Sequence, residues 1–290
     1  MFQNVSELVE QANQFGSVFE VMIALEMETT RMPRTEILKK MEQQLTVMEN
    51  AVEKGVNGVS SATGLTGGDA TKLKEYIEKG NFLSGETILT AVRNAVATNE
   101  VNAAMGLVCA TPTAGSAGVV PGVLFAAKER LNMDREAMVR FLFTAGAFGL
   151  VIANNASISG AEGGCQAEIG SASAIASAAL VDASGGTPEM CSAAIAMTLK
   201  NMMGLICDPV AGLVEVPCVK RNALGAAQAM ISADMALAGI TSVIPTDEVI
   251  AAMYKVGRQM PSIFKETAEG GLADTPTGRE IKMRIFGNPA

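Results

Sequence analysis

The chain has 290 residues, of which 49% are hydrophobic and 18% are charged, and its formal net charge is −8. This composition can build a sizeable core, so it excludes a wholly disordered chain, and the acidic balance disfavours a nucleic-acid-binding protein. The chain contains no histidine, so by itself it cannot supply a Ser-His-Asp triad, a Cys-His pair or a histidine-bearing zinc site.

Small residues dominate the composition, with 44 alanines and 29 glycines. Alanine has the highest helix propensity, aromatic residues make up only 4% of the chain, and alternating strand-like patterns are scarce. We therefore expect an all-α, mostly helical protein. The absence of repeats and low-complexity linkers favours a single compact domain over residues 1–290, with Gly- and Pro-rich loops between the helices.

The first third of the chain predicts helices separated by one polar loop. Residues 1–54 predict two acidic, amphipathic helices separated at Pro33, because apolar positions recur three or four residues apart. A Gly/Ser/Thr-rich loop is expected over residues 55–70, and Asp69 is expected to cap the next helix. A further helix is predicted over residues 84–99.

The rest of the chain alternates helices with loops. Pro188 suits the first turn of a helix, whereas two prolines within residues 207–221 exclude one regular helix there. The loops are expected at 109–122, 154–164 and 207–221, and the helices at 122–131, 134–148, 165–183, 187–206, 222–239, 245–256 and 277–286.

Two uncharged stretches, 101–127 and 141–161, are long enough to be considered as membrane spans. Prolines and glycines interrupt the first stretch and polar residues interrupt the second, so we interpret both as interior segments of a soluble protein with no membrane partner. The N-terminus lacks a basic start followed by an apolar run, so we expect a cytoplasmic protein.

The five cysteines are the most informative residues. Their odd number and the missing secretion signal argue against a disulfide framework. Cys165, Cys207 and Cys218 stand at element boundaries in Gly/Pro contexts, where thiolates can point into a shared site. Cys109 and Cys191 have Ala-rich or apolar neighbours, which favours simple packing. Spacing alone leaves open whether the first three form a cluster site.

Three thiolates around a four-iron cluster would leave one iron open, and an open iron is a Lewis acid that helps a hydroxyl group to leave. Such a site fits dehydration of a hydroxy acid. The Gly-rich loops at 63–69, 113–118 and 160–164, with the Lys220–Arg221 pair, could then hold a carboxylate. The same loops can also be plain tight turns, and none matches a P-loop or a dinucleotide fingerprint.

Four segments together identify a family. The sequences TPTAGSAGVVPG (111–122), EGGCQAEIGSASA (162–174) and CDPVAGLVEVPCVKRN (207–222) closely resemble the iron–sulfur-dependent bacterial L-serine dehydratases, and GLTGGDATK (64–72) belongs to the same pattern. The resemblance covers nearly the whole chain and corresponds to the α-chain of the two-subunit form of the enzyme.

This resemblance implies a [4Fe–4S] cluster held by Cys165, Cys207 and Cys218. It also implies conversion of L-serine to pyruvate and ammonia without pyridoxal phosphate. Lys220 is a candidate electrostatic clamp or, if burial lowers its pKa, a candidate base. The residues expected to contact the substrate are Thr113, Gly115, Ser116, Gly118, Thr66 and Gly67.

The sequence departs from the one-chain members of the family, which carry a Ser-Ser-Ser-His-Thr motif in a preceding domain. The resemblance implies that a separate β-subunit carries this histidine, so this chain alone is expected to be inactive or nearly so. The C-terminus also lacks the final cysteine that some one-chain relatives place on the open iron. Self-inhibition of that kind is therefore not expected.

Three other functions are compatible with parts of the pattern. A cysteine desulfidase-like lyase could use the same scaffold and release sulfide instead of water. If Cys109 or Cys191 completes the cluster, the protein is an electron carrier or a redox sensor. A pyridoxal-phosphate dehydratase would need a Schiff-base lysine, and no lysine stands in a suitable motif.

Overall fold

The protein is a bundle of helices in the computed structural model, which describes residues 2–287. Within that range the structure has no β-strand, only isolated bridges between Ser60 and Gly67 and between Cys207 and Lys265. The all-α prediction is therefore confirmed. The α-helices are α1 (Val5–Phe15), α2 (Val18–Thr30), α3 (Arg34–Val56), α4 (Asp69–Glu78), α5 (Glu86–Ala103), α6 (Val119–Leu131), α7 (Arg135–Asn155), α8 (Gly160–Gly163), α9 (Ser171–Ala183), α10 (Pro188–Met202), α11 (Cys218–Leu237), α12 (Thr246–Gln259) and α13 (Pro276–Phe286).

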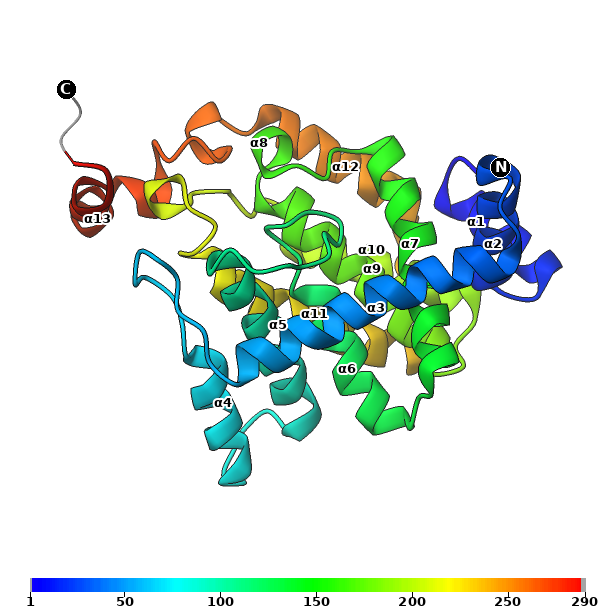
Figure 1. Cartoon of the computed structure of the whole chain (residues 1–290). Coiled ribbons are helices and arrows are strands. Elements are labelled where there is room, and N and C mark those ends of the chain that lie inside the picture. The colour runs from blue at the N-terminus through cyan, green and yellow to red at the C-terminus, as the bar shows by residue number, and fades with distance from the viewer. Residues whose placement is uncertain (1, 288–290) are drawn as a thin grey trace.

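The short elements lie mainly in the second half of the chain. A π-helix, η1, follows Cys165, and three 3-10 turns follow later in the chain. Helices α1 and α2 lie at one end of the molecule and α13 at the other, while α3 crosses the front (Figure 1). The bounds of the short elements are η1 (Gln166–Gly170), η2 (Val210–Gly212), η3 (Ser262–Phe264) and η4 (Gly271–Asp274).

The N-terminal segment corrects one expectation, because it forms three helices instead of two. Gly16 ends α1 in the left-handed conformation, with φ of 91°, which glycine adopts without strain. The Ser17 side chain then accepts a hydrogen bond from the Glu20 N–H and starts α2. Helical spacing continues across this Gly-Ser pair, so periodicity alone missed the break. Pro33 precedes α3, as predicted.

The expected cap of α4 is also corrected. The residue at the cap position is Gly68, and no side chain of the cap residue bonds to the helix. The carboxylate of Glu100, buried in α5, accepts hydrogen bonds from the N–H groups of Asp69 at 2.8 Å and Ala70 at 3.3 Å. Burial raises the pKa of Glu100 above its usual range. A carboxylate from a neighbouring helix thus caps α4 by accepting hydrogen bonds from its free N–H groups.

Other boundaries move in ways that concern the site. Helix α11 begins at Cys218 instead of Asn222, and the expected helix from residue 165 is a π-turn before α9. The predicted loop at 154–164 contains the short helix α8. Helix α7 continues to Asn155, seven residues beyond its predicted end. The first two changes place Cys218 and Cys165 at the start of a helical element.

Helix α9 forms the centre of the fold, and its residues from Ser171 to Val181 are all buried. It packs against α7, α10, α11 and α6. Its alanines and serines are small enough for close helix contacts, which explains the unusual composition. The buried Ser173 and Ser177 hydroxyls donate to backbone carbonyls of their own helix, so they need no outside partner.

The two uncharged stretches are interior only in part, because the loop before α6 exposes Met105 (90%) and Leu107 (74%). Residues 101–127 are divided between α5, a loop and α6. Helix α7 is the one helix of residues 2–287 that is long and apolar enough to cross a membrane, and 61% of its apolar window is buried inside the fold. It packs on α9 and α2 as a core helix.

We predict that Gly55→Ala destabilises the fold at the crossing of α3 and α5. A Cβ at this position would lie 2.6 Å from the Ala97 Cα, and the obstacle is backbone that cannot rotate away. Overpacking of this kind costs about 1–3 kcal/mol, so thermal unfolding should show a melting temperature lower by several degrees. Gly146→Ala in α7 is the control, since nothing lies within 4 Å of its Cβ. Equal melting temperatures for the two variants would contradict this prediction.

Candidate metal centre

Two of the three predicted cysteines meet a glutamate that the sequence analysis did not single out. The Sγ atoms of Cys165 and Cys207 and a carboxylate oxygen of Glu168 all lie within 4.8 Å of one another. Both cysteines are buried, each with a relative exposure of 2%. The two thiols come from segments more than forty residues apart, so only the tertiary fold brings them together.

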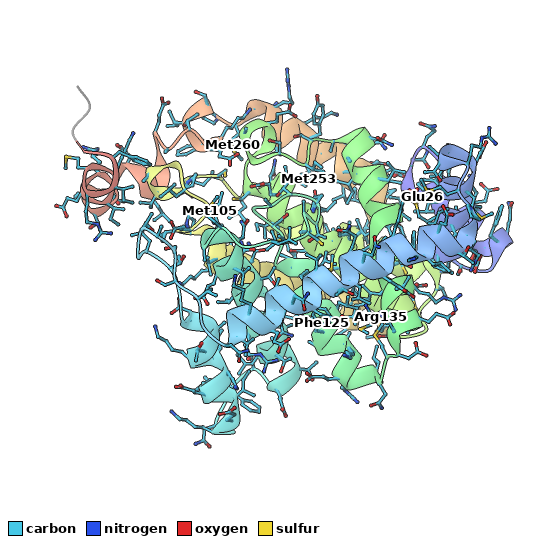
Figure 2. All side chains as sticks on the ribbon, in the orientation of Figure 1. Glu26, Met105, Phe125, Arg135, Met253 and Met260 are labelled. Atoms are coloured by element: carbon cyan, nitrogen blue, oxygen red, sulfur yellow. The ribbon has the colours of Figure 1, made fainter. Side chains whose placement is uncertain are left out.

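Cys165 stands at the start of the π-turn, directly after α8 and Gly164. Gly164 has φ of 75°, and a Cβ there would lie 2.7 Å from the Met260 Sδ and 2.9 Å from the Leu205 carbonyl oxygen. Met260 lies at the end of α12 beside this turn (Figure 2). Only glycine fits this close approach, which fixes how the chain enters Cys165. A π-turn often accompanies a functional site.

Cys207 is held by the C-terminal segment. Its N–H donates to the Phe264 carbonyl at 2.8 Å, and the Glu266 N–H donates to the Cys207 carbonyl at 2.9 Å. These two bonds form a short parallel bridge in an otherwise helical protein. The polar tail, which carried no functional signal in the sequence, therefore positions one of the predicted ligands.

Cys218 is the first residue of α11 and follows Pro217. Its side chain is buried, and burial raises its pKa to about 12, with the neighbouring charges of Cys165 and Glu168 acting in the same direction. Cys218 lies outside the group that Cys165, Cys207 and Glu168 form, so its part in a shared ligand set stays a prediction.

Arg221 reaches back from α11 to the cysteines. Its Nη1 donates to the Ile206 carbonyl at 2.8 Å and lies 3.4 Å from the Cys165 Sγ. Its Nη2 forms an ion pair with the buried Asp208 at 2.7 Å. The Cys207 thiol donates a hydrogen bond to Cys165, and together with the Arg221 charge this holds the pKa of Cys165 below its usual range. The same bond and burial raise the pKa of Cys207.

Glu168 links the cysteines to the loop at 111–118. Its Oε1 accepts a hydrogen bond from the Thr113 hydroxyl at 2.7 Å. Burial raises the pKa of Glu168, the Thr113 bond opposes this, and the nearby charge of Glu266 adds to it. The only signal for Glu168 in the sequence is its spacing, three residues after Cys165, which places both side chains on one face of a helical turn.

Two buried amides anchor the predicted substrate loop: the Asn99 Nδ2 donates to the Gly115 carbonyl at 3.1 Å, and Asn222 makes two further bonds. The Asn222 Oδ1 accepts from the Gly118 N–H at 3.0 Å, and its Nδ2 donates to the Gly115 carbonyl at 2.8 Å. Within the loop, the Ser116 hydroxyl lies 3.1 Å from the Thr113 hydroxyl. Asn222 stands one turn after Cys218 on α11, so one helix carries both a cysteine and an anchor of the loop.

Thr66 and Gly67 lie on a different loop. The Thr66 hydroxyl donates to the buried carboxylate of Glu215 at 3.0 Å, and the Thr63 hydroxyl donates to the same carboxylate at 2.8 Å. Gly67, with φ of 142°, packs against Ser60. Glu215 precedes Cys218 by three residues, so this loop is tied to the Cys218 segment. A contact between Thr66 or Gly67 and substrate stays a prediction.

Lys220 points away from Arg221. Its ammonium group forms an ion pair with Asp69, and 61% of its side chain is exposed. Asp69 also pairs with Lys72 at 2.9 Å, and these bonds hold the pKa of Asp69 below its usual range. Neighbouring residues of a helix face different directions, which separates Lys220 from Arg221. A role for Lys220 as clamp or base stays a prediction.

The two remaining cysteines lie elsewhere. Cys191 is fully buried in α10 within the main core, as expected, and burial raises its pKa. Cys109 is only partly buried and lies in a loop, where its thiol faces the Gln44 side chain at 3.1 Å. It borders an apolar cavity of about 440 Å³ between α3 and α7. Neither belongs to the group around Cys165.

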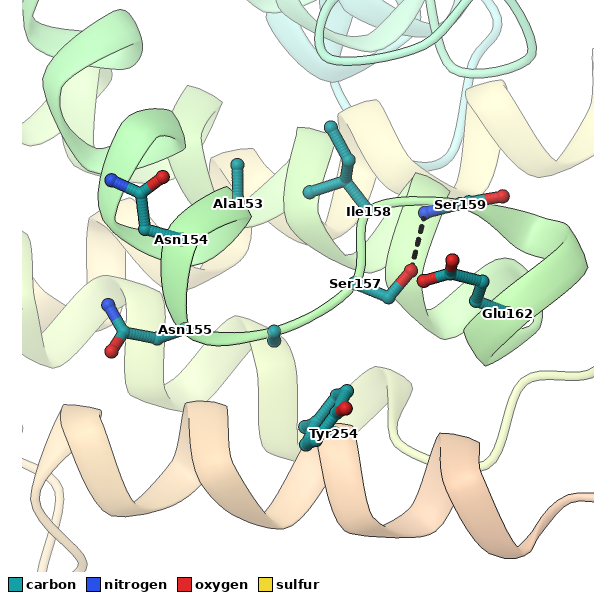
Figure 3. Close-up of a pocket in the computed structure, with 9 residues that line it drawn as sticks. Ala153, Asn154, Asn155, Ser157, Ile158, Ser159, Glu162 and Tyr254 are labelled. Atoms are coloured by element: carbon teal, nitrogen blue, oxygen red, sulfur yellow. Dashed lines mark hydrogen bonds between the residues drawn. The ribbon is translucent and has the colours of Figure 1, made fainter.

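A polar hollow of about 630 Å³ lies on the outer side of α8 (Figure 3). Its lining includes Asn154, Asn155, Ser157, Glu162 and Tyr254. Figure 3 shows Glu162 beside Ser157 and Ser159, with Tyr254 projecting from α12. The three site cysteines are absent from its lining.

The donors at the centre fit a metal or an iron–sulfur cluster. Thiolates are soft ligands that suit zinc and iron–sulfur clusters, and buried thiolates need a nearby positive charge. Arg221 supplies that charge at Cys165. Cys165 and Cys218 stand at the starts of η1 and α11, whereas Cys207 lies in the loop between α10 and η2, and Glu168 connects this region to the 111–118 loop through Thr113.

Comparisons with known proteins agree with this arrangement. A family model described as serine dehydratase alpha chain matches residues 14–273. The chain is 67% identical over 288 residues to the probable L-serine dehydratase, alpha chain, of Bacillus subtilis (strain 168), covering 99% of this chain and 96% of that protein. It is 41% identical over 285 residues to the L-serine dehydratase, alpha chain, of Peptoniphilus asaccharolyticus, covering 97% of both.

A longer relative matches over part of its length. L-serine dehydratase 1 of Escherichia coli (strain K12) is 34% identical over 279 residues, which are 94% of this chain but 61% of that protein.

We predict that Asn222→Ala loosens the 111–118 loop. It removes the acceptor of the Gly118 N–H, and an unpaired buried group costs about 1–3 kcal/mol, whereas the Gly115 carbonyl loses one of two donors and keeps the bond from Asn99. Hydrogen exchange should become faster at residues 113–118, with a smaller change in α9. Asn102→Ala is the control, because its single bond to the Ala114 carbonyl lies at the surface. Equal protection of the loop in both variants would show that Asn222 does not anchor it.

Proposed function

The chain belongs to the serine dehydratase alpha chain family, and on this premise we propose that it is the cluster-binding subunit of an L-serine dehydratase. In this proposal Cys165, Cys207 and Cys218 hold a [4Fe–4S] cluster. L-Serine is converted to pyruvate and ammonia, and no pyridoxal phosphate takes part. The protein works in the cytoplasm, where a reducing environment keeps its five free cysteines as thiols.

One observation carries the proposal: two buried thiols and a carboxylate meet beside the loop that the family motif assigns to substrate. A structural role alone would not need this loop to be bonded to a partly buried glutamate at the thiols. A positive charge at Cys165 supports thiolate ligation in particular, because a buried thiolate without such a partner is costly.

When bound, a cluster with one iron free of protein ligands supplies a Lewis acid for the departing hydroxide of L-serine. The protein's part is to hold the cluster and to orient the substrate. The cysteines fix the cluster, and Arg221 offsets their negative charge. The Ser116 hydroxyl and the N–H groups of the loop receive the substrate carboxylate, as oriented donors do at helix starts, while the Thr113 hydroxyl donates its one proton to Glu168.

Removal of the Cα proton and loss of hydroxide give aminoacrylate, which tautomerises to an imine and hydrolyses to pyruvate and ammonia. The proton needs a base near neutral pH, and this chain has no histidine. Lys220 is engaged by Asp69 at the surface, which favours a base from another chain. We therefore assign the base to a β-subunit that carries the His-containing motif.

Three ligands from this chain are favoured over four. Cys191 lies in the main hydrophobic core, whereas Cys165 and Cys207 lie in a separate small apolar cluster. Cys109 bonds to Gln44 and borders another cavity. Neither Cys191 nor Cys109 lies close enough to Cys165 and Cys207 to be a fourth ligand of the cluster. The geometry therefore supports a cluster with one open iron, as an enzyme needs, and disfavours an electron carrier.

We predict that Cys165→Ala, Cys207→Ala and Cys218→Ala each lose the cluster. A missing thiolate removes one of three protein ligands, so iron content after anaerobic reconstitution should fall several-fold, and the absorption of the cluster should fall with it. Cys191→Ala is the matched control and should keep wild-type iron content. A variant of any of the three that still binds four iron atoms per chain would remove that residue from the ligand set.

We also predict that activity depends on the partner. The reconstituted chain alone should form pyruvate from L-serine at least 100-fold more slowly than the chain mixed with the β-subunit, because general-base catalysis contributes about 10²–10⁴-fold. Pyruvate is measured from L-serine and sulfide from L-cysteine in parallel. Full turnover by this chain alone would refute the partner assignment, and sulfide as the faster product would favour the desulfidase reaction.

A further inference from the structure

Glu168 is held in a narrow space at the metal centre. A Cβ on Gly115 would lie 3.1 Å from its Oε1, and a Cβ on Gly160 would lie 2.7 Å from its Oε2. The two glycines come from the substrate loop and from α8, on either side of the carboxylate. Larger residues at either position would displace it, so the backbone of both segments fixes where the carboxylate lies.

The carboxylate is short of partners. Its only side-chain donor is the Thr113 hydroxyl, which bonds to Oε1. Among residues 2–287, no lysine or arginine nitrogen lies within ion-pair distance of it. The nearest guanidinium, that of Arg221, is engaged by Asp208 and the Ile206 carbonyl. Glu168 is partly buried, and taking a carboxylate without a charged partner even partly out of water is unfavourable, so such a group is usually completed by a cation.

L-Serine brings one cation, its α-ammonium group. Its carboxylate suits the hydroxyl and N–H donors of the 113–118 loop, and its hydroxyl is the group that leaves. The ammonium then needs an acceptor between the loop and the cysteines, which is where Glu168 lies. We propose that the Glu168 carboxylate binds the α-ammonium group of L-serine and so selects amino acids over hydroxy acids. This inference rests on the function proposed above.

A ligand role for Glu168 is the main competing explanation, because its carboxylate oxygen and the two thiol sulfurs all lie within 4.8 Å of one another. The Thr113 bond argues against it, since that bond directs Oε1 towards the loop. The two roles differ in what they predict. A metal ligand matters to the cluster before substrate arrives, whereas an ammonium acceptor matters only to ligands that carry a cation.

The test uses Glu168→Gln in the reconstituted complex with the β-subunit. Glutamine keeps the shape and the acceptor for Thr113 but removes the charge. Two unreactive fragments of serine separate the contacts: 2-aminoethanol has the ammonium and the hydroxyl, and 3-hydroxypropanoate has the carboxylate and the hydroxyl. Binding of each is followed by the EPR spectrum of the reduced cluster, and the KM for L-serine is measured alongside.

We expect Glu168→Gln to weaken 2-aminoethanol binding and to raise the KM for L-serine by about 10- to 100-fold, as for loss of a charge-assisted hydrogen bond. Binding of 3-hydroxypropanoate should change by less than about threefold. Glu162→Gln on α8 is the matched control. It removes a charge six residues earlier, in the outer polar hollow. It should change neither the binding of 2-aminoethanol nor the KM for L-serine.

Three results would overturn the inference. Equal weakening of both fragments would mean a general disturbance of the site, and no weakening of either would mean that Glu168 does not meet the ammonium. Altered iron content or an altered EPR spectrum without ligand would make Glu168 a metal ligand. A separate outcome concerns the proposed function itself. If the wild-type complex forms no pyruvate, and its EPR spectrum does not change with L-serine, 2-aminoethanol or 3-hydroxypropanoate, the proposed function fails and the inference fails with it.

Discussion

The ion pair between Arg221 and Asp208 is the interaction on which the rest of the centre depends. It joins the two ends of the segment that carries Cys207 and Cys218, because Asp208 directly follows Cys207 and Arg221 lies one turn after Cys218. The Asp208 Oδ2 also accepts the Leu272 N–H at 2.7 Å, which attaches the C-terminal segment. Breaking such a buried pair costs about 3–5 kcal/mol, since one charge stays without a partner. The same guanidinium reaches Cys165, so one side chain joins three segments.

Helix α11 extends this arrangement to the substrate side. Cys218, Arg221 and Asn222 lie within its first two turns and face a thiol, an ion pair and the 111–118 loop in turn. The helix is fixed in place by packing on α9, α10 and α5. Close helix packing requires small residues at the contacts, and this explains why alanine and glycine are so frequent near a polar site. The rigid core thus sets where these three side chains of α11 lie.

Buried and partly buried carboxylates have different partners in this protein, and the partners indicate their roles. Glu100 accepts backbone N–H groups at the start of α4, and Glu215 accepts threonine hydroxyls of the 63–66 loop. Both positions are explained by structure alone. Asp208 has a guanidinium. Glu168 accepts a hydrogen bond from one hydroxyl, that of Thr113, and lies beside the thiols of Cys165 and Cys207. Its surroundings therefore differ from those of the other three carboxylates. That contrast, together with a chain free of histidine, supports the proposal of a site that binds substrate and takes its base from a partner.

The sequence by itself determined the helical class, through its alanine content, and most helix positions, through apolar spacing and proline boundaries. It also pointed to Cys165, Cys207 and Cys218, because Gly and Pro mark the junctions where they stand. It did not reveal Glu168, the Arg221–Asp208 pair or the hold of the C-terminal segment on Cys207. These depend on contacts between residues 13 to 57 positions apart, or on which face of a helix a side chain occupies. Local patterns carry propensity and periodicity, whereas the partner of a buried charge is decided only when distant segments pack together.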